Sequence, residues 1–363
     1  MTSAGPREQR RSEPTIRDVA RAAGVSKSTV SNVIRSAGGV AEATRERVLA
    51  AAADVGYRPN ALARNLVRRR TTTVGIVVGD LSNPIFSELA KLAEQRLSRA
   101  GLATMICSTD GSPQREQEKL EMLLEHRVAG ILMLQFSGER STLARLRSAG
   151  TSVVLLTQWE EDADCVVLDE RRGAELAVSH LVGLGHTRIA YLSSELVELQ
   201  TDSARLAGYE DALRSAGIEP DPDLVTRLGH PAYLRSDPGL RSAIGRLVSL
   251  PDPATAVFAS NDLLAVDVLE TAEELRLAVP RDLSVAGFDD IQVSGLTRIS
   301  LTTVAQPCGE LARLGIELLL ERIDGAQGPR RQLLLEPSLV VRDSTSTPLR
   351  SREPEVADVF PGA

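Results

Sequence analysis

Hydrophobic and polar positions follow two different periods along the chain. Between residues 15 and 55 the apolar residues recur every three or four positions, which is typical of short helices with one apolar face. From residue 73 onward, short apolar runs alternate with longer amphipathic stretches, which is typical of strands separated by helices. The pattern predicts a small all-α part at the N-terminus followed by a larger α/β part.

The all-α part begins with two short helices joined by a tight turn. Thr15 and Asp18 have the spacing of a capping box, in which the hydroxyl caps the first helix and the carboxylate reaches back. Gly24 ends this helix, and Ser26 is suited to cap a second helix that runs to about Ile34. A second helix with small polar and basic side chains makes this pair a predicted helix-turn-helix motif.

A third helix, expected from about residue 43 to 55, would close the core of this part. The apolar residues predicted to do so are Val48, Leu49, Ala52 and Val55.

The second helix carries the side chains that we expect to contact DNA. Near its N-terminal half, Lys27, Ser28 and Asn32 are placed to reach base edges in the major groove. A lysine donates to guanine O6 and N7, whereas an asparagine suits adenine N6 and N7. The residues better placed for phosphates are Thr15, Ser26, Thr29 and Ser31.

The charge of the chain is divided unevenly between these two parts. Residues 1–70 hold 14 Lys and Arg against 6 Asp and Glu, a net charge of +8. The remaining residues hold 28 Lys and Arg against 43 Asp and Glu. The overall charge of −7 therefore hides a basic N-terminal part and an acidic remainder. Such a basic part favours contact with a polyanion, for which the DNA backbone is the obvious choice.

Seven apolar runs in the α/β part are expected to be strands, at 74–78, 102–107, 129–134, 152–156, 188–193, 255–259 and 283–288. Amphipathic stretches between them are expected to be helices, at 86–100, 114–126, 171–184, 202–216 and 262–276. This much alternation predicts two doubly wound parallel sheets, and ligands of such sheets bind beyond the carboxyl ends of strands.

Several other classes of protein are disfavoured by the sequence. Three widely spaced cysteines, without CxxC spacing, suggest neither a disulfide framework nor a zinc site, and no cofactor or metal is expected. No secretory signal or membrane-spanning run is found, so a cytoplasmic protein is expected. The chain has no P-loop, GxSxG or HExxH motif, and the scattered histidines, including His186, favour structural roles over catalysis.

Two stretches of the N-terminal part resemble the lactose/galactose-repressor (LacI/GalR) family of bacterial regulators. They read TIRDVARAAGVSKSTVSNVIR and TRERVLAAAADVGYRPNALARNL. Asn32 departs from the family, which usually has Arg there, and Ala41 stands where a Ser would cap the third helix. The missing cap is expected to cost about 1 kcal/mol of helix stability.

The resemblance implies a hinge helix from Asn60 to Leu66 that folds on DNA and pairs with its dimer mate. Asn60 would cap this helix, and Leu66 would insert into the minor groove as an apolar wedge. A plain linker is the alternative. The basic residues expected to neutralise adjacent phosphates are Arg64, Arg68, Arg69 and Arg70.

The α/β part also resembles the family, whose sensor is like a type I periplasmic sugar-binding protein with two lobes and three crossovers. The matching motifs are DLSNPIF, LGHTRI, ARLAGY, ASND, GFDD and LTTVAQP. The resemblance implies a headpiece (14–59), a hinge and linker (60–72) and a sensor (73–343). The start (1–13) and the polar tail (344–363), which has no match to the family, are expected to be disordered.

The resemblance also implies an effector site between the lobes. Ile85 and Phe86 would line one side, facing Arg205, Asn261 and Asp289. An Arg fork, an amide and a carboxylate suit the paired hydroxyls of a polyol. Salt bridging within one lobe is the alternative for these polar residues.

Two further residues are weaker candidates for this effector site. Trp159 would stack on an apolar sugar face, or else it packs between the lobes. Thr201 precedes Arg205 by four residues.

Together these observations predict a homodimeric regulator, most simply a repressor, that binds a pseudo-palindromic operator in double-stranded DNA. Its operator affinity would depend on a small molecule, a sugar or related metabolite, bound between the two sensor lobes. Control by a protein partner, or constitutive action with a non-functional cleft, is the alternative. A tetramer is left open, and no membrane partner or enzyme activity is expected.

Overall fold

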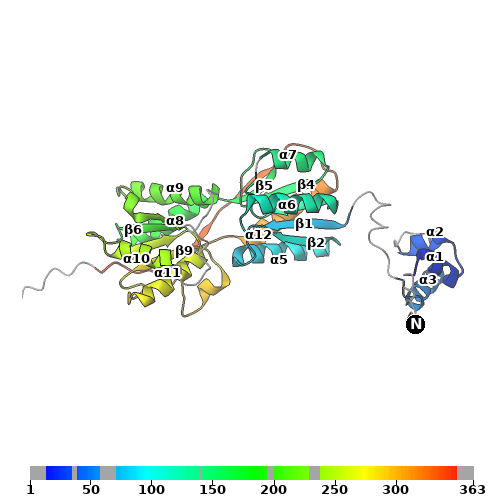
Figure 1. Cartoon of the computed structure of the whole chain (residues 1–363), viewed down its shortest axis with the longest axis horizontal. Coiled ribbons are helices and arrows are strands. Elements are labelled where there is room, and N and C mark those ends of the chain that lie inside the picture. The colour runs from blue at the N-terminus through cyan, green and yellow to red at the C-terminus, as the bar shows by residue number, and fades with distance from the viewer. Residues whose placement is uncertain are drawn as a thin grey trace, which may run out of the picture. The chain divides into compact units, whose positions relative to one another are not determined.

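The computed structural model describes residues 14–34, 39–57, 71–138, 140–193, 200–228 and 238–349. The chain divides into two compact units, residues 1–71 and 72–363 (Figure 1). No helix in the described ranges is long and apolar enough to cross a membrane.

In its described residues the first unit has three short helices, which are α1 (Ile16–Ala23), α2 (Lys27–Ile34) and α3 (Glu42–Asp54). Gly24 lies in the turn between α1 and α2 and has a φ of 65°. Residues other than glycine rarely adopt this left-handed backbone conformation. The buried core of this unit consists of Val19, Ala23, Val30, Val33, Val48 and Ala51.

The prediction that Leu49 belongs to this core is wrong, because 52% of the residue is exposed. Val48 and Ala51, three residues apart, face the other two helices and are buried. Leu49 is turned about 100° away from Val48 around the helix, toward solvent.

The second unit contains two six-stranded sheets. We call each sheet, together with the helices that cover it, a lobe. The lobe 1 sheet has the strand order β11-β5-β4-β3-β1-β2, and the lobe 2 sheet has the order β12-β10-β9-β8-β6-β7. The lobe 1 strands are β1 (Thr73–Val78), β2 (Ala103–Ser108), β3 (Gly130–Met133), β4 (Ser152–Leu156), β5 (Asp164–Leu168) and β11 (Gln332–Leu335). The lobe 2 strands are β6 (Ile189–Ser193), β7 (Val225–Arg227), β8 (Ala256–Ala259), β9 (Ser284–Asp289), β10 (Thr302–Ala305) and β12 (Ser338–Val340). All pairs are parallel except β10 with β12, so both predicted sheets are present.

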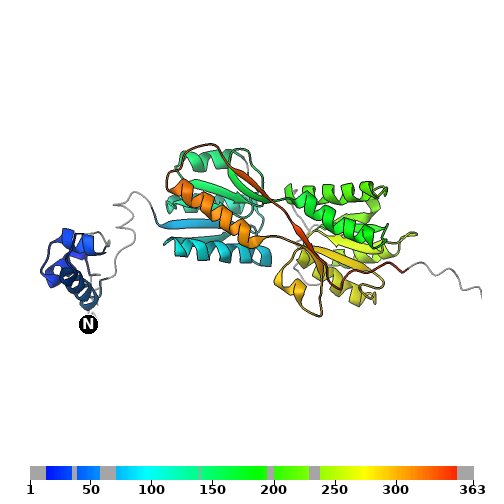
Figure 2. The same cartoon turned by 180° about the vertical axis from the view of Figure 1, so that it is seen from behind.

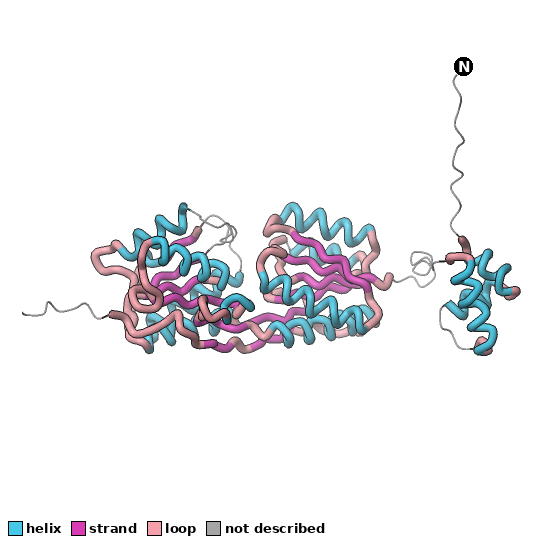
Figure 3. The backbone as a smooth tube through the Cα atoms, turned by 90° about the horizontal axis from the view of Figure 1, so that it is seen from below, coloured by secondary structure: helices cyan, strands magenta, loops and turns pink. Residues whose placement is uncertain are grey.

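Helices cover both faces of each sheet (Figures 1 and 3). The helices of lobe 1 are α5 (Pro84–Arg99), α6 (Pro113–Glu125), α7 (Arg140–Ser148) and α12 (Cys308–Ile323). Those of lobe 2 are α8 (Glu170–Gly183), α9 (Gln200–Ser215), α10 (Pro238–Val248) and α11 (Asp262–Glu274), with the short 3₁₀ turns η1 (Pro222–Leu224) and η2 (Gln292–Gly295). Alternate residues of a strand enter opposite cores: Ile76 packs with α5 and α12, whereas Val77 packs with α6 and α7.

The chain passes between the lobes three times, as the resemblance implies. The connections run from β5 to α8, from β10 to α12 and from β11 to β12. Figure 2 shows these passages on one side of the molecule, with α12 in front of the lobe 1 sheet. Elements distant in sequence therefore build each lobe, which explains why α12 and β11 lie in lobe 1.

The described C-terminal segment extends to residue 349, past residue 344, the predicted start of a disordered tail. Ser344 is buried, and its hydroxyl accepts a hydrogen bond from Thr302 N at 2.7 Å. The Ser346 carbonyl lies 2.8 Å from Nε2 of buried His186, whose Nδ1 is 2.8 Å from Thr255 Oγ1. His186 is thus a structural residue, as expected, and burial lowers its pKa.

Candidate functional sites

The predicted capping box is present at the start of α1. The carboxylate of Asp18 accepts hydrogen bonds from Thr15 N at 2.9 Å and from Thr15 Oγ1 at 2.7 Å. These hydrogen bonds lower the pKa of Asp18 below its usual value. Thr15 is therefore fixed at the exposed N-terminus of α1.

Ser26 caps α2, the predicted recognition helix. Its hydroxyl accepts a hydrogen bond from Thr29 N at 3.1 Å and lies 2.7 Å from Ser28 Oγ. The side chains of Lys27 and Ser28 are exposed in the first turn.

The other predicted DNA contacts fall into two groups. Thr29, Ser31 and Asn32 are half-buried along α2. Asn60 and Leu66 lie outside the described residues. Of the predicted contacts, Lys27 and Ser28 are thus the most exposed on the recognition helix.

A second polar cluster lies at the carboxyl ends of the lobe 2 strands. Four neighbouring parallel strands, β10, β9, β8 and β6, bring Gln306, Asp289, Ser260 and Ser193 to one edge of the sheet. We call this row of residues, together with Arg205 and Glu170, the polar edge. Ligands of doubly wound sheets bind at such edges.

Arg205 is the centre of the polar edge. Its Nε donates to Glu170 Oε2 at 2.8 Å, and its Nη2 lies 3.8 Å from Asp289 Oδ1. Nη1 donates to the Ser260 carbonyl, and the guanidinium carbon lies 3.8 Å from the centre of the Phe288 ring. The residue is only 7% exposed, so hydrogen bonds and a cation–π contact hold its fork rigidly.

The carboxylate environment of Asp289 is unusual. Burial raises its pKa to about 8, although Arg205 opposes the shift. Its Oδ1 accepts a hydrogen bond from Gln306 Nε2 at 2.7 Å. Asp289 and Asp290 also have φ values of 121° and 53°, conformations that are costly for residues other than glycine. Backbone strain and a shifted pKa at one position are typical of a functional site.

Several buried atoms of the polar edge have no hydrogen-bond partner in the described structure. They are Glu170 Oε1, Ser193 Oγ, Ser260 Oγ and Gln306 Oε1. Buried polar atoms are nearly always paired, so each of these atoms calls for an explanation. Two are pure acceptors and two are hydroxyls, which suits a ligand with several hydroxyl groups.

The other predicted effector residues are less tightly grouped. Asn261 caps α11, because its side-chain oxygen accepts a hydrogen bond from Leu264 N at 2.9 Å. Ile85 is buried on α5 in the same apolar cluster as Ile291 of lobe 2, with Phe86 half-buried against it.

Thr201 and Trp159 are the two weaker candidates for the effector site. Thr201 is half-buried at the start of α9. Trp159, after β4, is 43% exposed. Among the polar candidates, Arg205 and Asp289 are brought together directly.

Glu170 and Gln306 were not predicted from the sequence. Glu170 follows Asp169, the N-cap of α8, and looks like an ordinary first-turn acid. Its pKa is raised by burial, against the effect of Arg205. Only the fold brings Glu170 to Arg205, 35 residues away.

A helix-turn-helix unit followed by a two-lobed sensor defines a class of DNA-binding transcription regulators. The profile of bacterial regulatory proteins of the lacI family matches residues 15–60, and that of the periplasmic binding protein-like domain matches residues 178–345. The regulator GalR of Escherichia coli strain K12 is 37% identical over 92% of this chain and 96% of its own length. The chain therefore belongs to the lacI family.

Solved structures agree with this assignment. The lac repressor dimer bound to operator and the anti-inducer ONPF covers 92% of this chain and 100% of its own, with 27% identity and a TM-score of 0.80. A lacI-family regulator from Enterococcus faecium with bound ribose covers 77% and 100%, with 30% identity and a TM-score of 0.67. These relatives are transcription regulators, in agreement with the prediction that the chain is not an enzyme.

Proposed function

We propose that this protein is a cytoplasmic transcriptional repressor whose operator affinity is controlled by a small polyol bound at the polar edge. The observation that carries the proposal is the row of unpaired buried acceptors and hydroxyls beside the fixed fork of Arg205. A pentose or hexose supplies hydroxyl donors to Glu170 Oε1 and Gln306 Oε1 and accepts from Arg205. The ribose bound to the Enterococcus faecium relative supports a sugar as the effector class.

The DNA half of the proposal rests on α2. Lys27, Ser28 and Asn32 read base edges in the major groove, and Thr15, Ser26, Thr29 and Ser31 contact phosphates. The protein acts as a homodimer on a pseudo-palindromic operator, because a two-fold dimer presents two recognition helices to two half-sites. The operator-bound dimer of the lac repressor supports this arrangement.

The link between the halves is a two-state equilibrium. Sugar binding at the polar edge changes how lobe 2 closes on Ile85 and Phe86 of lobe 1, and Asn261, Thr201 and Trp159 complete the site. Closure sets whether the hinge segment from Asn60 to Leu66 folds on the minor groove. The coupling is reciprocal, so operator DNA changes sugar affinity by the same factor.

The test is a fluorescence-anisotropy titration of selected operator DNA, with and without pentoses, hexoses, disaccharides and nucleosides. A tenfold shift in operator affinity by one compound, about 1.4 kcal/mol of coupling, supports the sensor proposal. Tight operator binding that no compound changes would instead favour a protein partner or constitutive action. Leu66→Ala should weaken operator binding more than non-specific binding, and equal losses would exclude the wedge.

Lys27→Ala tests the reading of bases. Loss of a base contact is expected to cost about 1–3 kcal/mol of discrimination against the wrong base, with little change in non-specific affinity. Thr29→Ala is a suitable comparison, because a phosphate contact affects all sequences alike. If both variants lose affinity uniformly, Lys27 contacts the backbone.

A further inference from the structure

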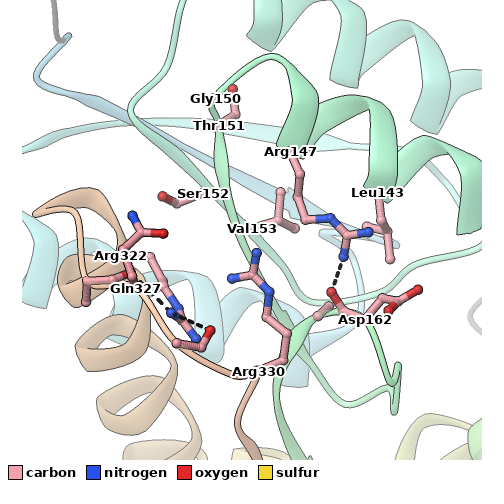
Figure 4. A pocket seen from close by; sticks show the side chains of 13 residues that line it. Leu143, Arg147, Gly150, Thr151, Ser152, Val153, Asp162, Arg322, Gln327 and Arg330 are labelled. Atoms are coloured by element: carbon pink, nitrogen blue, oxygen red, sulfur yellow. Dashed lines mark hydrogen bonds between the residues drawn. The ribbon is translucent and has the colours of Figure 1, made fainter.

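A pocket of about 220 Å³ lies in lobe 1 at the end of the sheet where the parallel strands begin (Figure 4). The N-terminus of α5 lies at the other end of this sheet, after the last residue of β1. Residues from the starts of β4 and β5, the C-terminal ends of α7 and α12, and the loop before β11 line it. It is smaller than the 300–1,000 Å³ typical of sites for drug-sized ligands. A pocket of this size accommodates a small chemical group.

Three arginines from separate elements line this pocket: Arg147, Arg322 and Arg330. Arg322 is fixed by Asp164, to which its Nε and Nη2 donate at 2.9 and 3.0 Å, and its side chain is 8% exposed. Arg330 shares the same carboxylate through Nη1 at 3.1 Å, but its side chain is 36% exposed. One buried carboxylate thus serves two guanidinium groups.

Asp164 remains ionised in this arrangement. Burial tends to raise its pKa, but hydrogen bonds from Arg322, Arg331 N and Arg330 outweigh burial and lower the pKa overall. It therefore offsets one positive charge. The second guanidinium of the pair keeps its charge uncompensated.

Arg147 adds a further positive charge from the last turn of α7. One of its Nη1 hydrogens is donated to the backbone carbonyl of Asp162, and no carboxylate in the described ranges forms an ion pair with it. Figure 4 shows the Asp162 carboxylate turned away from the pocket, while the guanidinium groups of Arg147 and Arg330 approach the space between them. The two positive charges repel each other unless an anion lies between them, so this arrangement favours the binding of an anion.

We propose that this pocket binds a phosphate group between Arg147 and Arg330. Each guanidinium presents several N–H donors in a planar fork, which matches the oxygens of a phosphate. Ser152 and Gln327 line the same space and supply further polar groups. Arg330, Gly150 and Gln327 are exposed, so the pocket is open to solvent.

The position of the pocket suggests what the phosphate does. β1 begins at Thr73, and the register Val74–Gly130–Ser152 places its start two strands from β4, about 10 Å away. The chain from the DNA-binding unit therefore enters lobe 1 at this same end of the sheet. A phosphate bound here lies beside the strand through which the first unit is joined to lobe 1. Its source is either a small phosphate ester or the DNA backbone, and operator titrations distinguish the two.

Isothermal titration of the full-length protein with inorganic phosphate and pyrophosphate, at fixed ionic strength, tests the site. We expect saturable binding that weakens at least tenfold in Arg147→Gln and in Arg330→Gln. Arg331→Gln is the matched control, because the Arg331 side chain pairs with Glu321 and does not line the pocket. Arg147→Lys keeps the charge without the fork and should fall between these results.

Operator titrations over a range of salt concentrations distinguish the two sources. If DNA supplies the phosphate, Arg147→Gln lowers the slope of log affinity against log salt by about 0.9 for each lost contact. Phosphate binding with an unchanged slope identifies a small phosphate ester. The proposal is overturned if both glutamine variants bind phosphate and operator like the wild type, or if they only lower thermal stability. Arg147 and Arg330 would then be counter-charges for the helix ends.

Discussion

Arg205 on α9 donates its Nε hydrogen to Glu170 Oε2, 2.8 Å away at the start of α8. Both residues are buried, and Gly208, one turn along α9, allows the two helices to approach closely. Arg205 Nη1 also donates a hydrogen bond to the Ser260 carbonyl. The pair therefore joins α8 and α9 to the end of β8. The pair therefore positions the polar edge as well as stabilising lobe 2.

Arg205→Met should destabilise the sensor by about 3–5 kcal/mol, because it leaves the Glu170 carboxylate buried without its cation. The double variant Glu170→Gln/Arg205→Met should recover most of this loss, since neither residue of the pair then carries a charge. Urea unfolding of each variant measures the difference. Arg171→Met is the control, because its side chain is 59% exposed and should cost no more than about 1 kcal/mol. A double variant as unstable as the single one would contradict this account.

The stability of the sensor should fall as pH rises from about 6 to 8. The folded protein holds a proton on Asp289 up to a pKa of about 8, whereas the unfolded chain releases it near the usual value of 3.8. The stabilising contribution is present at low pH and is lost at up to about 1.4 kcal/mol per pH unit.

Asp289→Asn should flatten this pH dependence, because an amide does not titrate. Burial raises the pKa of Asp262 to about 6. This group therefore also lowers the stability of the sensor as pH rises, but mainly below pH 6. Thermal unfolding of the wild type and Asp289→Asn between pH 6 and 8 therefore measures Asp289 as the difference between the two curves, because both proteins share the contributions of Glu170 and His186. Parallel curves for wild type and variant in that window would show that another group titrates.

Local features of this protein could be predicted from the sequence, whereas long-range contacts could not. The capping box of Thr15 and Asp18 depends on residues three apart, and it was predicted correctly. Strand–helix alternation likewise gave two parallel sheets. β10 was missed because its sequence TTVA is short and partly polar, and its burial comes from neighbours elsewhere in the chain.

The polar edge illustrates the same distinction. Arg205 and Asp289 were proposed from a family resemblance, and the fold brings them within 3.8 Å. Glu170 carries no local mark that separates it from an exposed first-turn acid. Its burial arises only when β5 leads into α8 beside α9. The arginine pocket of lobe 1 was missed for the same reason, since three distant segments form it.

Ser260→Ala should separate ligand binding from stability. The Ser260 hydroxyl is buried without a partner, so its removal should leave stability unchanged or raise it by about 1 kcal/mol. If the effector bonds this hydroxyl, its affinity should fall about 5- to 10-fold, measured by anisotropy of the operator complex. Ser294→Ala is the contrasting variant, because its hydroxyl donates to Asp262 at 2.6 Å and its loss should destabilise the fold. Unchanged effector affinity in Ser260→Ala would remove Ser260 from the site.

Ala41→Ser should stabilise the DNA-binding unit by about 1 kcal/mol. Ala41 occupies the N-cap of α3 with φ −61° and ψ 143°, an extended geometry that a serine cap also adopts, but it offers no side-chain acceptor. Hydrogen exchange of peptides from α3 in the full-length protein should slow accordingly. Ala52→Ser, within the same helix, provides no cap and should not slow exchange. Equal protection in the two variants would show that α3 is limited by tertiary packing.

Two glycines in helices of lobe 2 should respond in opposite ways to alanine. A Cβ on Gly208 would lie 2.2 Å from the Arg171 carbonyl oxygen and 2.9 Å from the Ala174 Cβ, so α8 and α9 would have to separate. Gly208→Ala should therefore destabilise the sensor by several kcal/mol and displace Arg205 from Glu170.

Gly245 on α10 has nothing within 4 Å of such a Cβ. Gly245→Ala should therefore stabilise the sensor by about 0.5–1 kcal/mol, because alanine lowers the conformational entropy of the unfolded chain and favours the helix. Thermal unfolding of both variants checks the sign. A stabilised Gly208→Ala variant would mean that α8 and α9 separate without cost, and that the Arg205–Glu170 pair does not require their close approach.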